Sequence, residues 1–140
     1  MPDLFARFAL NTRHIIQVDN VWRLSSSCFK KRKTDECLSV FCIDDCVNCE
    51  EVFDLGSRVL RGICGYGQLE YEGICSVEYC DKEHLCCSVV QSGVDSRHFE
   101  IHPGRKDMET MEKFQQIKAC ELMEKGLSER SLAFLIGCKS

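Results

Sequence analysis

The sequence lacks any run that approaches the roughly 18 apolar residues of a membrane span, so we expect no membrane partner. Its N-terminal residues contain no basic leader followed by a long apolar core, which predicts a chain that is not secreted. The chain also lacks the strong positive charge of a protein that coats nucleic acid, since its formal net charge is −4. Any contact with nucleic acid must therefore come from a local basic patch.

Cysteine, by contrast, is unusually abundant, with 12 among 140 residues. So many thiols indicate either a disulfide framework or metal thiolates. A disulfide framework needs a secretory route, which the N-terminal residues do not indicate. We therefore expect a reducing compartment and prefer metal binding over disulfides. The length suits one domain of ordinary size.

Two motifs in the middle of the chain have the spacing of a zinc site. Cys46 and Cys49 form a CxxC, in which one tight turn can direct both sulfurs to one point. Cys80 and His84 form a CxxxH, which places the two side chains about one helical turn apart on one face. A structural zinc ion takes such ligands in a tetrahedron. The sequence therefore predicts one Zn²⁺ site made of these four residues.

Other thiols and imidazoles leave a second zinc ion, or a different ligand set, open. These alternative ligands are Cys37, Cys42, Cys64, Cys75, Cys86, Cys87, His98 and His102. The two histidines form an HxxxH, although the neighbouring Arg97 favours an exposed loop for both. Bound zinc contributes on the order of 10–16 kcal/mol of folding free energy, enough to decide whether such a centre folds.

A run of basic residues, Lys30, Lys31, Arg32 and Lys33, is the local patch that this acidic chain offers. Such a run can serve as a nuclear address that an import receptor recognises, or as a contact for phosphate groups. The alternative is a solvated segment that only aids solubility. The sequence leaves these alternatives open.

Residues 1–27 predict a helix followed by a hairpin. Apolar residues at helical spacing indicate a short helix over residues 3–10. Two β-prone runs, 14–18 and 21–24, flank an Asp-Asn turn and indicate the hairpin. The single tryptophan, Trp22, is predicted to be a core residue.

The next two segments are a basic one and a cysteine-rich one. Residues 28–36 form the basic segment, and residues 37–106 form the predicted zinc-binding core. Short strands are predicted within this core over residues 57–63 and 68–71. Residues 107–140 form a helical segment.

The C-terminal segment predicts a helix over residues 107–125 that ends at Gly126. A second short helix is predicted over residues 129–136. The elements together predict an α+β fold. It would be a small zinc-stabilised cysteine-rich domain with short antiparallel strands, an N-terminal helix and hairpin, and C-terminal helices, in one folded unit.

The sequence does not indicate catalysis. A cysteine nucleophile needs a base and an orienting group, and the metal-ligand spacings explain the cysteines and histidines with fewer assumptions. A closed site of three cysteines and one histidine leaves zinc no open position for water, and no HExxH motif is present. The CxxC also lacks the βαβ pattern of a thioredoxin-like redox protein. We therefore expect a protein that is not an enzyme.

Three stretches carry a resemblance to a known family: Cys46-Val-Asn-Cys49, Gly62-Ile-Cys-Gly65 and Tyr79-Cys-Asp-Lys-Glu-His84. With the basic run ahead of them and the polar helix behind them, they resemble the cysteine-rich proteins of rod-shaped plant RNA viruses. The benyvirus type is the most similar, and the hordei-, furo- and pecluvirus types are relatives. The resemblance covers roughly residues 28–125 in layout and only these short stretches in motif.

The resemblance implies suppression of host RNA silencing by a zinc-finger-type RNA-binding protein. It implies small duplex RNA, host silencing proteins and a host import receptor as partners, self-association as a homodimer, and residence in the host cytoplasm, nucleus and nucleolus. The basic run would carry the nuclear address. The chain departs from some relatives in ending Cys138-Lys-Ser140 rather than Ser-Lys-Leu, and in having Asp81 where they have glycine.

The acidic balance and the apolar C-terminal residues support an alternative. In it, the chain is a zinc-stabilised protein–protein interaction module that captures a host factor without contacting nucleic acid. Salt-dependent binding of RNA separates the two hypotheses, because phosphate contacts release counterions.

Overall fold

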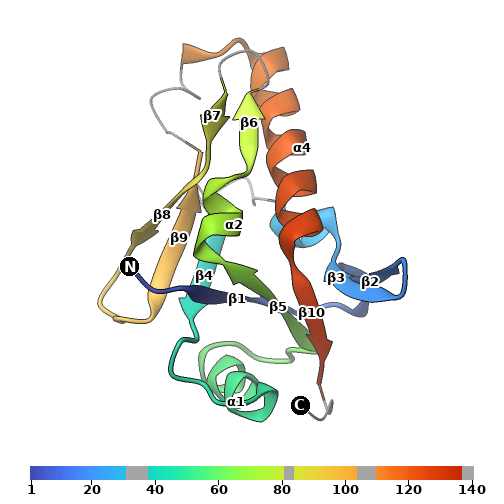
Figure 1. Ribbon diagram of the computed structural model, residues 1–140, viewed down its shortest axis with the longest axis vertical. Coiled ribbons are helices and arrows are strands. Elements are labelled where there is room, and N and C mark those ends of the chain that lie inside the picture. The colour runs from blue at the N-terminus through green and yellow to red at the C-terminus, as the bar shows by residue number, and fades with distance from the viewer. Residues whose placement is uncertain (31–37, 81–83, 104–109, 137–140) are drawn as a thin grey trace.

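An antiparallel sheet of six strands forms the centre of the protein, which a computed structural model describes over residues 1–30, 38–80, 84–103 and 110–136. The strand order is β10-β5-β1-β4-β9-β8, and every neighbouring pair is antiparallel (Figure 1). The strands are β1 (Leu4–Ala9), β4 (Leu38–Cys42), β5 (Gly65–Glu70), β8 (Ser88–Gln91), β9 (His98–His102) and β10 (Leu132–Leu135). This architecture confirms the predicted α+β class with antiparallel strands.

Helices and two small hairpins surround the sheet. The helices are α1 (Cys49–Val59), α2 (Tyr71–Cys75) and α4 (Lys113–Arg130), with 3₁₀ turns η1 (Thr12–His14) and η2 (Ser26–Phe29). The hairpins are β2 (Ile15–Val18) with β3 (Val21–Leu24), and β6 (Glu78–Cys80) with β7 (Leu85–Cys86). The sheet thus draws its strands from the N-terminal, cysteine-rich and C-terminal segments of the sequence.

Strand β1 occupies the middle of the sheet, so the helix predicted over residues 3–10 is wrong. Phe5 and Ala9 face one core cluster, whereas Ala6 and Phe8 face another, so both faces of the strand are covered. A strand that is covered on both faces is apolar almost throughout. Its apolar residues then match a helical spacing by coincidence, which misled the prediction.

The two faces of the sheet carry different cores. One face packs against α2, α4 and η2, which contribute Ile74, Met123 and Phe29 to its core cluster. The other packs against α1, whose Val52 and Phe53 join the cluster of that face. Burial of these apolar side chains supplies the main free energy that holds the helices on the sheet.

Helix α1 replaces the strand predicted over residues 57–63, which is wrong at least over Ser57–Val59. Asn48 caps the helix, because its side-chain oxygen accepts a hydrogen bond of 3.0 Å from the Glu51 N–H. The Glu51 carboxylate in turn accepts a hydrogen bond of 3.2 Å from the N–H of Val47, the residue before the cap. The strand predicted over residues 68–71 corresponds to β5, although β5 begins earlier and α2 starts at Tyr71.

The β2–β3 hairpin is confirmed. Asp19 and Asn20 have φ angles of 49° and 65°, which is the left-handed pair that a type I′ turn requires. Trp22, however, is 42% exposed, so its predicted place in the core is wrong. Leu24 lies on the same face of β3 and is fully buried against Gly67. Trp22 lies two residues nearer the tip of the hairpin, beyond the part that the sheet covers.

In the described part of the C-terminal segment, helix α4 is followed by strand β10. Helix α4 begins at Lys113 and continues through Gly126 to Arg130, so Gly126 is not its end; the predicted start, residues 107–109, lies outside the described residues. A Cβ at Gly126 would lie 2.6 Å from Cγ1 of Val77, so glycine permits a close approach of the helix there. The second helix predicted over residues 129–136 is wrong, because β10 occupies that position.

Among the described residues, no helix has both the length and the apolar character needed to cross a membrane. The longest one, α4, carries charged residues along its length.

Candidate functional site

The predicted CxxC lies where the chain passes from β4 into α1. Cys46 is in the connecting turn, where its N–H donates a hydrogen bond of 3.0 Å to the carbonyl of Ile43. Cys49 is the first residue of α1 and is buried. The tight turn expected from the spacing is therefore present.

The predicted CxxxH adopts a different geometry from the expected helical turn. Cys80 is the last residue of β6 and pairs with Leu85 of β7. His84 has a φ of 53°, its side chain is 77% exposed, and its Nδ1 lies 3.3 Å from Oε1 of Glu78. Cys80 thus ends one strand of a hairpin and His84 directly precedes the other, so the prediction that they share one face of a helix is wrong.

The structure does not bring the four predicted zinc ligands together. The β6–β7 hairpin lies at the upper end of the molecule and α1 at the lower end (Figure 1). Within the described parts of the chain, no three or more His, Cys, Asp or Glu side chains are grouped so that they could hold a metal ion. Cys46, Cys49, Cys80 and His84 therefore do not fit a single tetrahedral ion in this conformation.

The alternative cysteine ligands are spread over several elements. Cys42 ends β4, Cys75 ends α2, and the Cys64 thiol donates a hydrogen bond of 3.3 Å to the carbonyl of Ala9. Cys86 is exposed, and Cys37 lies outside the described residues. None of the ten cysteines that the structure describes belongs to a disulfide.

Burial keeps Cys87 protonated at neutral pH. Desolvation, helped by the nearby Cys86 and Cys75, raises the pKa of Cys87 to about 12. Burial likewise raises the pKa of Cys28, against the opposing effect of Arg7. Because the thiolate is both the metal ligand and the nucleophile, Cys87 is poorly suited to either role.

His98 and His102 lie on β9, so the exposed loop favoured for them is wrong. They are four residues apart on one face of the strand, a separation of roughly 13 Å that rules out one shared ion. His98 contacts the Ser39 hydroxyl and the Ser92 carbonyl, each at 3.0 Å. His102 Nε2 lies 3.2 Å from the Glu100 carboxylate. Both imidazoles are thus held by the sheet itself.

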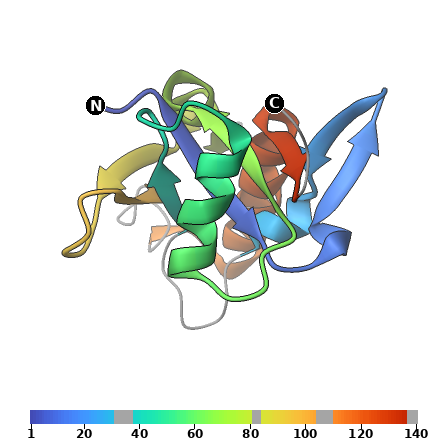
Figure 2. The ribbon, with the colours of Figure 1, turned by 90° about the horizontal axis from the view of Figure 1, so that it is seen from below.

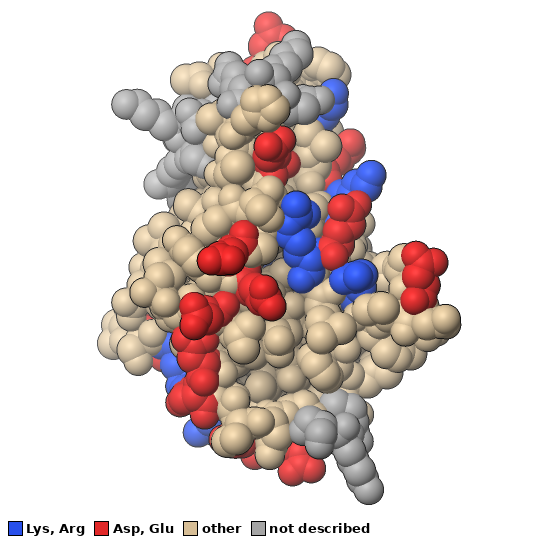
Figure 3. Space-filling model, viewed as in Figure 1, with Lys and Arg blue, Asp and Glu red and all other residues tan. Residues whose placement is uncertain are grey.

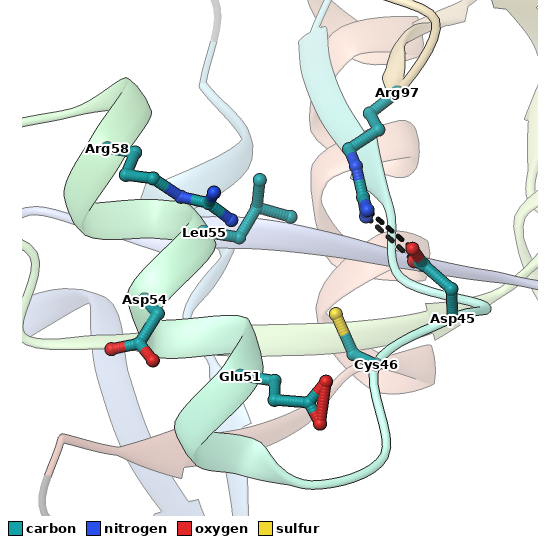
Figure 4. Close-up of a pocket in the computed structure, with 7 residues that line it drawn as sticks. All are labelled: Asp45, Cys46, Glu51, Asp54, Leu55, Arg58 and Arg97. Atoms are coloured by element: carbon teal, nitrogen blue, oxygen red, sulfur yellow. Dashed lines mark hydrogen bonds and ion pairs between the residues drawn. The ribbon is translucent and has the colours of Figure 1, made fainter.

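A polar pocket of about 330 Å³ opens beside the CxxC, between α1 and the start of β9. Its lining residues are Asp45, Cys46, Glu51, Asp54, Leu55, Arg58 and Arg97. The Cys46 sulfur points into it, and the Arg97 guanidinium forms an ion pair with the Asp45 carboxylate across its rim (Figure 4). The pocket therefore places a thiol among carboxylates and guanidinium groups.

The electrostatics of this pocket do not activate the thiol. Burial and the Asp45 carboxylate raise the pKa of Cys46, and Arg97 only partly opposes them. Arg97 is itself bound to Asp45, and this hydrogen bond lowers the pKa of the Asp45 carboxyl. The lining contains no histidine that could act as a base. A nucleophile needs both an adjacent base and a stabilised thiolate, so the pocket does not support cysteine catalysis.

The basic run lies mostly outside the described residues. Lys30 follows η2 and is exposed, whereas Lys31, Arg32 and Lys33 are not among the residues that the structure describes. The structure therefore neither supports nor opposes a role for this run.

No match to the chain is found among protein-family models, curated proteins or solved structures. The function must therefore be argued from the geometry of the chain itself.

Strand β10 is last in the order of the sheet, and β3 lies against it. The Ile136 N–H donates a hydrogen bond of 2.9 Å to the Cys64 carbonyl, which shows which residues of β10 bond to β5. The hydrogen-bonding groups of Leu132 and Phe134 face β5, and those of Ala133 and Leu135 point away from it. Among the described residues these outward groups have no hydrogen-bond partner, but Ala133 is only 5% exposed, so Leu135, at 37% exposed, is the accessible one of the two.

The side chains around this edge are apolar. Leu132, Leu135 and Ile136 are 43%, 37% and 54% exposed, and β3, which carries Trp22, lies against β10. We name Trp22, Leu132, Leu135 and Ile136 the β10 surface. In Figure 3 the area over β10 is largely uncharged, whereas acidic and basic side chains lie at the β2–β3 hairpin and acidic side chains gather to the left. Figure 2 also shows the hairpin projecting beside β10.

Sequence reasoning identified the apolar residues Leu132, Leu135 and Ile136 as a docking face, but it placed them on a helix over residues 129–136 and did not include Trp22. The available signal was the run Leu132-Ala-Phe-Leu-Ile136, a charge-free stretch rich in aliphatic and aromatic residues. Such a composition is as compatible with a strand as with a helix, and its short length favours a strand.

Proposed function

We propose that this chain is a protein-binding module rather than an enzyme, and that it binds an extended segment of its partner at the Leu135 end of β10. The observation that carries the proposal is an uncharged edge strand on which Leu132, Leu135 and Ile136 are exposed. Natural proteins usually protect such edges with lysine, proline or a bulge, because an open edge pairs with other chains. The run from Leu132 to Ile136 contains none of the protecting residues.

Strand addition accounts for both parts of the surface. Main-chain hydrogen bonds from Leu135 would supply affinity, and pockets for alternate side chains would supply specificity. Leu132, Ile136 and Trp22 would pack against the side chains of the added strand. The resemblance to cysteine-rich viral suppressors makes a host silencing protein the expected partner, and suppression of RNA silencing by its capture the expected outcome.

A second candidate function is RNA binding through Lys30, Lys31, Arg32 and Lys33. The observation that favours it is a basic run on a chain whose net charge is otherwise negative. Binding would then weaken steeply with salt, because each phosphate contact releases counterions. Zinc bound to the cysteine-rich segment would support this activity, and chelation of the metal should then abolish it.

A reporter assay of silencing suppression with the variant Leu135→Pro tests the proposal. Proline removes an N–H that points away from β5, and it is tolerated on edge strands, so the sheet should remain intact. We expect Leu135→Pro to lose suppression because the partner strand loses a donor and meets the proline ring.

The matched control is Gln91→Pro on the opposite edge of the sheet. The Ser92 N–H donates a hydrogen bond of 3.0 Å to the His98 carbonyl of the neighbouring strand. Because successive N–H groups of a strand point to opposite sides, the Gln91 N–H points away from that strand. We expect Gln91→Pro to retain suppression. Suppression that survives Leu135→Pro and is lost when residues 30–33 are changed to alanine would reject the module and favour RNA binding.

A further inference from the structure

We propose that the pocket between α1 and the start of β9 binds a short zwitterion, a molecule whose ammonium and carboxylate groups are separated by several methylene groups. The ammonium would bind the Glu51 carboxylate, and the carboxylate would bind the Arg58 guanidinium. The pocket shares no residue with the β10 surface, so this inference goes beyond the proposed function and does not depend on it.

Three residues on one face of α1 give the pocket its pattern of charge. Glu51, Leu55 and Arg58 are four and then three residues apart, so their side chains follow one another along the same side of the helix. Glu51 and Arg58 are two turns apart, roughly 10.5 Å along the helix axis. Both charged groups extend toward the side on which Asp45 and Arg97 lie (Figure 4). A carboxylate, an apolar side chain and a guanidinium therefore line the pocket in that order.

The charges of Glu51 and Arg58 have no ion-pair partner within the described part of the chain. Asp54 is four residues before Arg58, a spacing at which opposite charges on a helix ordinarily pair. The two side chains instead point apart (Figure 4). The Val47 N–H donates a hydrogen bond of 3.2 Å to Oε2 of Glu51, which holds the carboxylate at the pocket without compensating its charge. Both charges are therefore available to a ligand.

The opposite wall of the pocket adds shape but no net charge. The Arg97 guanidinium donates to both oxygens of the Asp45 carboxylate, one of them at 2.7 Å, so these two charges compensate each other. The Cys42 N–H donates a hydrogen bond of 2.8 Å to the Arg97 carbonyl, which holds this wall to β4. Burial raises the pKa of Cys46, so its thiol is neutral at pH 7.

This pattern of charge determines the class of ligand. A simple cation would be repelled by Arg58, and a simple anion by Glu51, whereas a zwitterion satisfies both. Hydrogen bonds of about 2.8 Å at its two ends leave several ångströms between the charges of the ligand, more than in glycine. Leu55 would pack against the methylene groups between them. The ligand is therefore an ω-amino acid, or the ammonium and carboxylate of a lysine that ends a chain, and about 330 Å³ has room for either.

Titration of the full chain with δ-aminovalerate, followed by the amide chemical shifts of α1, tests the inference. We expect saturable shifts at the residues that line the pocket. Glycine, pentylamine and pentanoate lack either the charge separation or one of the charges, and they should bind at least about tenfold more weakly. Nα-acetyl-lysine distinguishes the two sources of the ligand. Binding as tight as that of δ-aminovalerate assigns the pocket to a terminal lysine, and weaker binding assigns it to a free ω-amino acid.

Two variants and two matched controls locate the binding. Glu51→Gln and Arg58→Gln should each raise the Kd of δ-aminovalerate at least about tenfold. Glutamine at position 51 keeps an oxygen for the Val47 N–H, so the start of the helix is retained. The controls Glu50→Gln and Arg61→Gln remove the same charges from exposed residues that do not line the pocket, and they should leave the Kd unchanged.

The absence of saturable shifts in the wild-type chain would overturn the inference. Pentylamine or pentanoate that binds as tightly as δ-aminovalerate would do so too, because one charge would then suffice. Binding that survives both Glu51→Gln and Arg58→Gln, or that falls equally in the two controls, would show that these two charges do not form the site. The dispersion of the amide spectrum shows whether each variant is folded.

Discussion

Replacing Arg7 by methionine is expected to lower the free energy of unfolding by about 2–4 kcal/mol, because it leaves two carbonyl groups without their donors. Arg7 lies in the central strand β1, and its Nε and Nη2 donate to the Cys28 carbonyl at 3.1 and 3.0 Å. Its Nη1 donates to the Ser39 carbonyl at 2.8 Å. One guanidinium thus connects β1 to η2 and to β4. Methionine keeps an apolar stem of similar length and removes every donor.

The effect of Arg7→Met is measured by urea unfolding. A lower midpoint with an unchanged slope reports a loss of stability without a change in the surface exposed on unfolding. Arg13→Met is the control, since Arg13 is exposed on the η1 turn. Equal midpoints for Arg7→Met and Arg13→Met would contradict the role given to the Arg7 guanidinium.

The second large effect is expected from Gly67→Ala, which should lower the free energy of unfolding by about 2–3 kcal/mol through overpacking. A Cβ at Gly67 would lie 2.3 Å from Cδ1 and 2.4 Å from Cγ of Leu24. Leu24 is fully buried, so it has little room to move away. The β2–β3 hairpin could therefore no longer pack closely against β5.

Gly73→Ala provides the contrast to Gly67→Ala. The nearest atoms to a Cβ at Gly73 are 3.9 Å away, which is ordinary contact distance. Gly73 lies within helix α2, where alanine is favoured over glycine by up to about 1 kcal/mol. Thermal unfolding of both variants should therefore give midpoint shifts of opposite sign. A Gly67→Ala protein as stable as the wild type would show that the hairpin does not pack on the sheet as described.

The parts of the fold that sequence reasoning predicted are those with a local cause. The Asp19-Asn20 turn has residues that tolerate left-handed angles, and it produced the predicted hairpin. Strand β1 and strand β10 were both interpreted as helices. Their neighbours in the sheet are β5 for both and β4 for β1, and these contacts are remote in sequence. Strand β1 is covered on both faces and so has no alternation of apolar and polar residues, and β10 is a short apolar run, so the local pattern reveals neither strand.

The predicted site depended on spacing alone, and spacing does not decide which segments meet. The CxxC did form its tight turn, because such a turn needs only neighbouring residues. Whether Cys80 and His84 reach that turn depends on the topology of the sheet, which places the β6–β7 hairpin away from α1. The position of β10 at the edge of the sheet could not be predicted either, because it depends on which strand is last in the order.

Amide hydrogen exchange resolved at single residues tests the central claim most directly, because it reports which N–H groups of β10 are free. The account predicts that the Phe134 amide, which faces β5, is protected at every concentration. The amide of Leu135 should exchange rapidly in the free protein and become protected when the partner binds. Protection of Leu135 in the free protein, or rapid exchange at Phe134, would contradict a free Leu135 end of β10.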